Sequence, residues 1–201
     1  MRVFPAPMHT RRSTRGPLTL LSVGFAFLLL SGLDRIPRDR PEGYSAVAMG
    51  TGGSVGGKTI VFQFRIERWT SDDEVRQLAE SLRANGPDAL RRTLEKLRVG
   101  AIAPVGSIGT DIAVARKRQT GVGTVITIVT VRNMPFLELS RGTRSKDYPF
   151  GFLQVTLDQK GEGSGQIMVA AKIRFDKKKG SYEIESYGNQ YIKAVNVRPL
   201  Q

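Results

Sequence analysis

Short alternating segments separated by glycine-bearing loops fill the second half of the sequence, and they restrict the fold more than any other feature. DIAVARKR alternates apolar and polar residues, and TVITIVTVR is rich in β-branched residues. FGFLQVTLD, SGQIMVAAKIRF, SYEIESY and QYIKAVNVR follow, separated by QKGEG, DKKKG and GN. Alternation with a period of two is typical of half-buried strands, and short glycine-bearing loops join antiparallel neighbours. The sequence therefore predicts an antiparallel sheet from Thr110 onward.

Two helices are predicted ahead of this sheet. Ser71-Asp72-Asp73-Glu74 has the form of a capping box, which begins a helix. Asn85-Gly86-Pro87 is a stop signal whose proline suits the first turn of a second helix. Apolar residues at helical spacing are Val75, Leu78, Ala79, Leu82, Leu90, Leu94 and Leu97. We therefore expect a helical hairpin with one buried side.

Together these elements predict the α+β class, with residues 58–201 forming a single domain. The expected architecture is a curved antiparallel sheet of about six or seven strands packed against the helical hairpin. The sequence does not decide whether this sheet closes into a partial barrel. The helix leucines should pack on the sheet face that carries Phe62, Phe64 and Ile66, because neither element can bury its apolar side alone.

The N-terminus has the pattern of an export signal. Arg11, Arg12 and Arg15 precede an apolar run from Pro17 to Leu33. The run is short for a transmembrane helix of roughly 20 residues, which favours a cleaved signal; an uncleaved membrane anchor through 17–33 is the alternative. We expect an export signal over 1–33, a flexible glycine-rich linker or short edge strand over 34–57, and a periplasmic or secreted protein.

The stretch GGSVGGKT, from Gly52 to Thr59, matches the phosphate-binding loop G-x-x-x-x-G-K-[ST] letter for letter. That loop works only when a helix begins at its lysine, since the helix N-terminus faces the phosphates. The residues that follow, IVFQFRIERW, alternate with the period of a strand. We therefore predict that the match is a coincidence of a glycine-rich linker and that no nucleotide is bound.

The composition excludes several kinds of catalytic and metal-binding chemistry. The chain has no cysteine and a single histidine, His9, which lies ahead of the apolar run. Catalytic triads, thiol chemistry and histidine- or cysteine-bound metals are therefore not expected, and we predict no catalytic or metal-ligating residue and no cofactor. A carboxylate pair or a Ser/Lys dyad remains possible in principle, although the spacing of residues marks neither.

The candidate binding residues lie at two places. Trp69, the only tryptophan, falls where a predicted strand meets the first helix; it could be a ligand platform or could pack the strand end against the helices. Arg141, Arg144, Lys146 and Tyr148, with Asp147, lie on the longest connection between predicted strands. Long connections are often functional, and a solvated loop is the alternative.

Basic runs provide a further hypothesis, since the formal net charge is +13. Arg116-Lys117-Arg118 and Lys177-Lys178-Lys179 could bind polyanions or could simply keep hairpin turns soluble. No aromatic and basic motif accompanies them, so nucleic acid is not favoured as a partner. Asp158-Gln159-Lys160-Gly161-Glu162-Gly163 is similar to a calcium loop, but Lys160 stands where an oxygen ligand is needed, so a plain turn is expected.

From about Tyr44 onward the chain resembles a family of uncharacterised exported bacterial proteins. The resemblance rests on IERWTSDDE, SIGTDI, DYPFGFLQVTLDQKGEGSGQIMVAAKI and IESYGNQ. It implies export and a single domain, and it implies no activity. The sequence thus predicts a non-catalytic binding or accessory module of the cell envelope or secreted space, with an anionic envelope component or a small ligand as partner. The alternatives are a hydrolase that uses carboxylate or Ser/Lys chemistry and a polyanion-binding protein.

Overall fold

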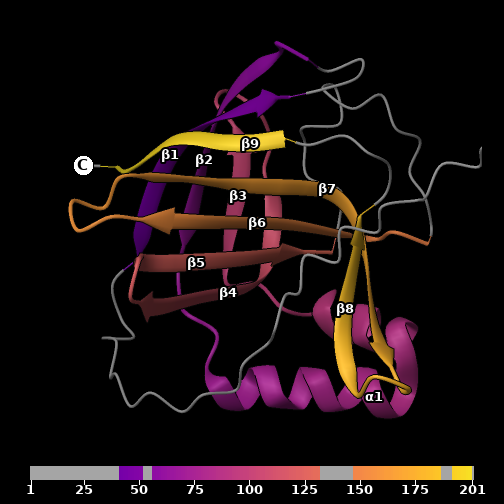
Figure 1. Ribbon diagram of the computed structural model, residues 1–201. Helices are drawn as coiled ribbons and strands as arrows, with labels where there is room; N and C mark the ends of the chain where they lie inside the picture. Colours follow the sequence, from indigo (N-terminus) through magenta and orange to yellow (C-terminus); the bar gives the residue numbers. More distant parts are fainter. Residues whose placement is uncertain (1–40, 52–55, 132–146, 187–191, 201) are drawn as a thin grey trace, which may run out of the picture.

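The computed structural model describes residues 41–51, 56–131, 147–186 and 192–200. Within these ranges the chain forms nine strands and one helix (Figure 1). The elements are, in chain order, β1 (Glu42–Gly50), β2 (Thr59–Ile66), α1 (Asp72–Leu94), β3 (Gly100–Pro104), β4 (Thr110–Thr120), β5 (Gly123–Thr130), β6 (Phe150–Leu157), β7 (Gly163–Asp176), β8 (Ser181–Ser186) and β9 (Ile192–Pro199).

Eight of these strands form a closed antiparallel barrel. The strand order is β6-β5-β4-β3-β2-β1-β9-β7-β8, and an additional pairing between β6 and β7 closes the ring. Strand β8 lies outside the ring and pairs with the far half of β7. The predicted α+β class is therefore wrong: the molecule is mostly β. The hairpins β4–β5, β6–β7 and β7–β8 form as predicted. Strands β8 and β9, expected to be neighbours across the GN loop, do not pair within the described residues: β9 pairs with β7 and β1 instead, and local patterns do not specify such contacts between distant segments.

The barrel interior is an apolar core. Every strand of the ring contributes alternate side chains to it, as expected for strands whose two faces differ. Its largest fully buried members include Phe62, Phe64, Ile102, Ile126 and Leu153. Tyr44 stacks on Phe64, with ring centroids 4.9 Å apart. Aromatic and branched aliphatic side chains thus fill the space that the strands enclose.

Helix α1 is a single helix with a kink, and the predicted helical hairpin is wrong. The capping box at Ser71 and Glu74 forms as predicted. At the predicted stop, Gly86 leaves helical geometry with φ 78° and ψ −179°, and the chain continues into Pro87 as a second helical stretch. The stop signal therefore bends the helix instead of reversing it, as Figure 1 shows at the right-hand end of α1.

The helix packs on the outside of the barrel, not on the face that carries Phe62, Phe64 and Ile66. Those three side chains belong to the interior core. The helix leucines instead join a second apolar cluster on the outer side of β4, β5, β6 and β7. Its buried members are Leu82, Leu90, Leu94, Ala113, Val114, Val129, Phe150, Phe152 and Ala171. A closed barrel has its Phe62 face inside, so no helix could reach it.

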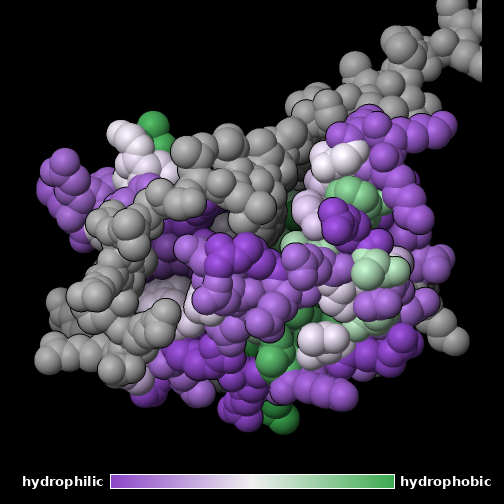
Figure 2. All heavy atoms as spheres, turned by 90° about the horizontal axis from the view of Figure 1, so that it is seen from below, coloured by the Kyte–Doolittle hydropathy of each residue, from purple (hydrophilic) through white to green (hydrophobic). Residues whose placement is uncertain are grey.

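The hairpin of β7 and β8 completes this outer layer. Both strands extend past the ring toward α1 (Figure 1). Their side chains Ile173, Phe175, Tyr182 and Ile184 pack against the outer cluster. The Tyr182 hydroxyl donates a hydrogen bond to the Ala79 carbonyl oxygen at 3.1 Å. Seen from the side on which α1 lies, the described surface is mainly hydrophilic, with small scattered hydrophobic areas (Figure 2).

Glycines allow the barrel to close between β6 and β7. Strand β7 pairs with β6 and with β9 over the same residues, Gly163 to Ile167. A Cβ atom on Gly163 or on Gly165 would stand 1.9 Å from a backbone oxygen of β6, far inside contact distance. The alternating glycines of GEGSGQI are therefore required by the close approach of two backbones.

The N-terminal part of the chain is described from residue 41. The predicted export signal over 1–33 lies outside the described residues. The stretch Tyr44–Met49, expected at most as a short edge strand, lies within β1, which pairs with β2 on one side and β9 on the other. Among the residues that the structure describes, no helix has the length and apolar character needed to cross a membrane.

Candidate functional site

Trp69 lies at one end of the barrel in a polar cluster with Glu42, Tyr44 and Lys117, which we call the barrel-end cluster. Strand β3 is short and pairs with β4 only as far as Ile112. Beyond that point the segment before α1 pairs with β4: the Thr70 amide donates to the Ala115 carbonyl oxygen at 2.8 Å, and the Ala115 amide donates to Thr70 Oγ1 at 3.0 Å. This docking places the adjacent Trp69 indole over the barrel end.

The Glu42 carboxylate is the centre of the barrel-end cluster. It accepts hydrogen bonds from Lys117 Nζ at 2.8 Å, from the Tyr44 hydroxyl at 2.6 Å and from Trp69 Nε1 at 3.2 Å. Lys117 Nζ also lies 5.4 Å from the centre of the Trp69 ring, within the range of a cation–π contact. Both charged side chains are mostly buried, with 20% of Lys117 and 28% of Glu42 exposed.

The pKa shifts in the barrel-end cluster favour a structural role. Burial alone would raise the pKa of Glu42, but the hydrogen bonds from Lys117, Tyr44 and Trp69 and the charge of Lys117 outweigh burial and lower it. Burial and the hydrogen bond to Glu42 raise the pKa of Tyr44. The carboxylate is thus held ionised and the phenol neutral, so neither is suited to exchange a proton near neutral pH.

The first basic run is divided among different partners. Arg116, Lys117 and Arg118 lie on β4, whose alternation turns successive side chains to opposite faces. Arg116 pairs with Asp72 at the start of α1, and Lys117 points to Glu42 at the barrel end. The three cations therefore do not form one patch. In the second run, at the turn between β7 and β8, Lys179 pairs with Glu183 at 2.7 Å and with Asp176 at 3.7 Å.

The loop candidates are described only in part. Arg141, Arg144 and Lys146 lie outside the described residues. Tyr148 is described: its hydroxyl donates a hydrogen bond to the Glu185 carboxylate of β8 at 2.7 Å, and this bond raises the pKa of Tyr148. Tyr148 lies on the side of the molecule where β8 extends from the ring, so the structure does not bring it together with Trp69 in any described contact.

Two motif matches have plain structural explanations. Thr59 opens strand β2, so no helix begins at Lys58 as a phosphate loop requires. The Gly50 amide donates to the Lys58 carbonyl oxygen at 2.9 Å, as in a strand-to-strand connection. In the loop that is similar to a calcium site, Asp158 Oδ1 accepts the amides of Lys160 and Glu162 at 2.8 and 3.0 Å. The described ranges contain no cluster of three or more acidic or histidine side chains that could hold a metal ion.

An exposed apolar strip on the opposite outer face was not predicted from the sequence. We call the outer side of β3, β2, β1 and β9 the open face. The strand registers place Val47 beside Val61 and beside Val195, and the Val105 amide donates to the Val61 carbonyl oxygen at 3.0 Å. These four valines, the valine row, thus cross the face from strand to strand. Val61 is 50% exposed and Val105 is 58% exposed.

Cations lie on both sides of the valine row. Arg65 and Arg198 lie toward the barrel end that carries Glu42, and Lys193 lies beyond the row on the other side. All three side chains are exposed, and none forms an ion pair with another described residue. Elsewhere on the molecule, by contrast, many basic side chains have acidic neighbours, as in the pairs Arg68–Glu74 and Arg91–Glu95.

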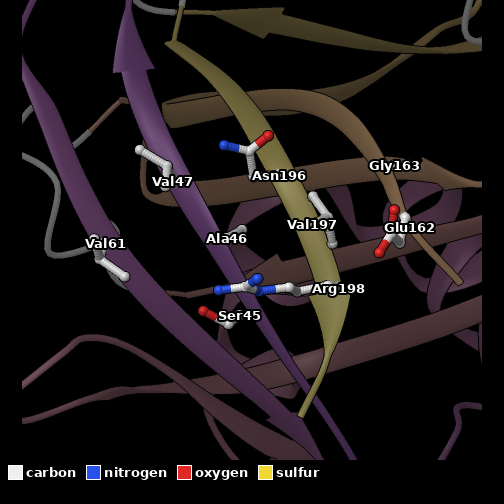
Figure 3. A pocket seen from close by; sticks show the side chains of 9 residues that line it. All are labelled: Ser45, Ala46, Val47, Val61, Glu162, Gly163, Asn196, Val197 and Arg198. Atoms are coloured by element: carbon white, nitrogen blue, oxygen red, sulfur yellow. The ribbon is translucent and has the colours of Figure 1, made fainter.

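A hollow of about 400 Å³, open to solvent, adjoins the valine row. It lies where β9 bulges: Asn196 takes a left-handed conformation with φ 52°, and the pairings of β9 with β1 and with β7 both shift register there. Figure 3 shows the Arg198 side chain extending from β9 across β1 toward Ser45. The lining residues are Ser45, Ala46, Val47, Val61, Glu162, Gly163, Asn196, Val197 and Arg198.

Comparison of the chain with protein-family models, with curated proteins and with solved structures finds no match. The candidate surface therefore has to be interpreted from its own residues. The sequence held one signal for it, since the alternation of β2 puts Val61 on the face opposite to Phe62 and Phe64. The sequence did not indicate that β9 would lie beside β1 and extend the row.

Proposed function

We propose that the chain is a non-catalytic, exported binding or accessory module that acts in the cell envelope or the secreted space. The basic and apolar N-terminal pattern supports export, and the resemblance to exported bacterial proteins points the same way. The partner binds on the outside of the barrel, and the open face with its valine row is the best-supported place.

The observation that supports a surface role is the filled barrel interior. A closed eight-stranded barrel either fills its interior with side chains or holds one small ligand there. Here Phe62, Ile102, Ile126 and Leu153 are fully buried at the centre, and Phe64 is 1% exposed. A small ligand would have to displace this packing, so a carrier function inside the barrel is not favoured.

The barrel-end cluster bears most directly on the alternative function, that of a hydrolase. Among the described residues, Lys117 and Glu42 form the lysine–carboxylate pair that is most shielded from solvent. The carboxylate accepts bonds from three side chains and has a lowered pKa, which disfavours action as a general acid. A polyanion-binding protein is less favoured, because the two basic runs are neutralised in part by Asp72, Glu42, Asp176 and Glu183.

Turnover assays distinguish the binding module from the hydrolase. The purified protein, with β1 included, is incubated with fluorogenic glycoside, ester, phosphoester and peptide substrates, beside the variant Glu42→Gln. We expect no turnover above the level of a buffer blank. Turnover by the parent that the variant loses would replace the proposed function with hydrolysis at the barrel end.

Export is tested separately. A C-terminally tagged full-length chain is expressed in a bacterium, and the cells are fractionated. We expect the tagged protein outside the cytoplasm and shortened by about 30 to 43 residues, as an export signal implies. N-terminal sequencing that found Met1 on a cytoplasmic protein would contradict this localisation.

A further inference from the structure

The open face has the composition of a protein-binding surface that would favour acidic side chains in its partner. An apolar strip with polar groups around it is the usual anatomy of a protein interface. Here the strip is the valine row, and the surrounding polar side chains include Gln63 and Ser45, which lie beside each other in register. The cations Arg65, Lys193 and Arg198 form no ion pair with another described residue, so each is available to pair with a bound acid.

We propose that the open face binds an acidic segment of a partner protein. One carboxylate of that segment pairs with Arg198 at the hollow, and a neighbouring apolar side chain lies on Val61 and Val47. This inference rests on the proposed function, since it names the partner class of the same surface. A bidentate carboxylate–guanidinium pair gives both strength and orientation, which a lysine-only surface would not provide.

The mode of binding follows from the closed ring. Each strand of the open face already has neighbours on both sides, so the backbone amides of β1, β2 and β9 are used within the barrel. A partner cannot add a strand to this sheet, as it can at an open edge. The segment must therefore lie across the side chains, with its own apolar residue over the valine row.

A second copy of this chain fits the surface poorly. A symmetric dimer places the same patch on both subunits, so Arg65, Lys193 and Arg198 would face the same cations. Glu162, at the edge of the hollow, is the one carboxylate among the residues that line it. Like charges brought together across an interface oppose association, so the observed charges favour a different, acidic partner.

A lipid surface also fits poorly. Gln63, Ser45 and Asn196 lie next to the valine row, and acyl chains offer no groups that could replace their bonds to water. Electrostatic docking to anionic lipid usually takes a cluster of about four to eight basic residues, more than the three on this face. A protein segment supplies backbone carbonyls and amides for the same polar side chains.

The test is a peptide-display selection on the purified protein, with β1 included. A library of random twelve-residue peptides is panned on the parent, and enriched peptides are resynthesised and measured by fluorescence anisotropy. We expect enrichment of Asp or Glu next to apolar residues, with affinity that falls as salt is raised. Arg198→Glu should weaken binding about tenfold or more, and Val61→Thr should weaken it by about threefold.

The matched control is Arg83→Glu, which makes the same change of charge at an exposed position on α1. It should leave peptide affinity within twofold of the parent, because α1 covers the other face. Circular dichroism and thermal melting confirm that all three variants are folded.

Three outcomes overturn the inference. The first is enriched peptides that bind Arg198→Glu and Val61→Thr as tightly as the parent. The second is no enrichment at all. The third is binding to vesicles of phosphatidylglycerol and phosphatidylcholine that Val61→Thr abolishes, which would assign the face to lipid. None of these outcomes involves substrate turnover, so the proposed non-catalytic function is judged independently by the assays above.

Discussion

The two outer faces of the barrel differ in what covers their apolar side chains. On the face formed by β4 to β7, the outer residues Phe150 and Phe152 are buried under α1 and the β7–β8 hairpin. On the open face, Val61 and Val105 keep half or more of their surface exposed. Both faces alternate between an inner and an outer set of residues. The difference teaches that alternation alone does not tell which outer apolar residues serve the fold and which are available to a partner.

The largest effect is expected at the junction of the two faces, where β7 contacts both β6 and β9. A Cβ atom on Gly165 would lie 1.9 Å from the Gln154 carbonyl oxygen, a backbone atom that cannot move without opening the ring. We expect Gly165→Ala to lower the free energy of unfolding by roughly 3 kcal/mol or more, or to prevent folding. Guanidinium titration followed by circular dichroism measures this loss.

Gly121→Ala is the matched control for that substitution. A Cβ atom on Gly121, at the turn between β4 and β5, would meet nothing within 4 Å. Its midpoint of unfolding should stay close to that of the parent. If Gly165→Ala were as stable as Gly121→Ala, the pairing of β7 with both neighbours would be wrong, and the two faces would not belong to one closed ring.

The covered face gives the second prediction. Leu82 and Leu94 are 3% and 2% exposed in the cluster between α1 and the barrel. Replacing either leucine with alanine should cost about 2 to 5 kcal/mol, because apolar contacts are lost and a cavity remains. Arg83→Ala, at an exposed position between them in the same helix, should change stability by about 0.5 kcal/mol or less. Equal unfolding midpoints for all three variants would show that α1 is not docked on this face.

The sequence predicted local structure well and the assembly of that structure poorly. The capping box at Ser71 begins α1 as predicted, and the alternation after Thr59 forms β2. Both patterns involve residues that are neighbours in the chain. The error was to expect an open sheet instead of a closed barrel. An open sheet has a face for helices to cover, whereas a closed barrel puts that face inside. Closure depends on β9, which pairs with β1 on one side and with β7 on the other, and the pairing between β1 and β9 joins the two ends of the described chain.

The candidate site shows the same limit. Trp69 was identified as a candidate residue, and its position between a strand and a helix was predicted. Its contacts with Glu42 and Lys117 could not be predicted from spacing. Glu42 lies 27 positions from Trp69 and 75 positions from Lys117 in the sequence. The valine row was missed for the same reason, since its members come from three different strands and from Val105, which directly follows β3.

The barrel-end cluster lies between the two faces and gives the third prediction. Glu42→Gln should lower the free energy of unfolding by roughly 2 kcal/mol at neutral pH, because the buried Lys117 ammonium loses its charged partner. The pKa of Glu42 is lowered from its ordinary value of 4.5, so its contribution is complete above that pH and is lost as pH falls through the pKa of the folded state. The difference between parent and variant should therefore shrink in acid.

Denaturant titrations at several pH values between neutral and strongly acidic conditions measure this difference. Glu80→Gln, which removes an exposed carboxylate from α1, is the control and should change stability little. A stability difference between the parent and Glu42→Gln that stayed constant through the acidic range would contradict the account of Glu42 as the ionised centre of the cluster.

The smallest effect is expected on the open face. Val61→Thr keeps the β-branched shape that suits a strand and replaces one methyl group with a hydroxyl that water can reach, since the side chain is 50% exposed. We expect the free energy of unfolding to change by about 0.5 kcal/mol or less. The comparable substitution Val155→Thr, inside the barrel where Val155 is fully buried, should cost more, because its hydroxyl would have no water partner. Thermal melts of the two variants measure the contrast directly. A large loss for Val61→Thr would mean that the valine row is covered in the folded protein and serves its stability, and the distinction between the two faces would then fail.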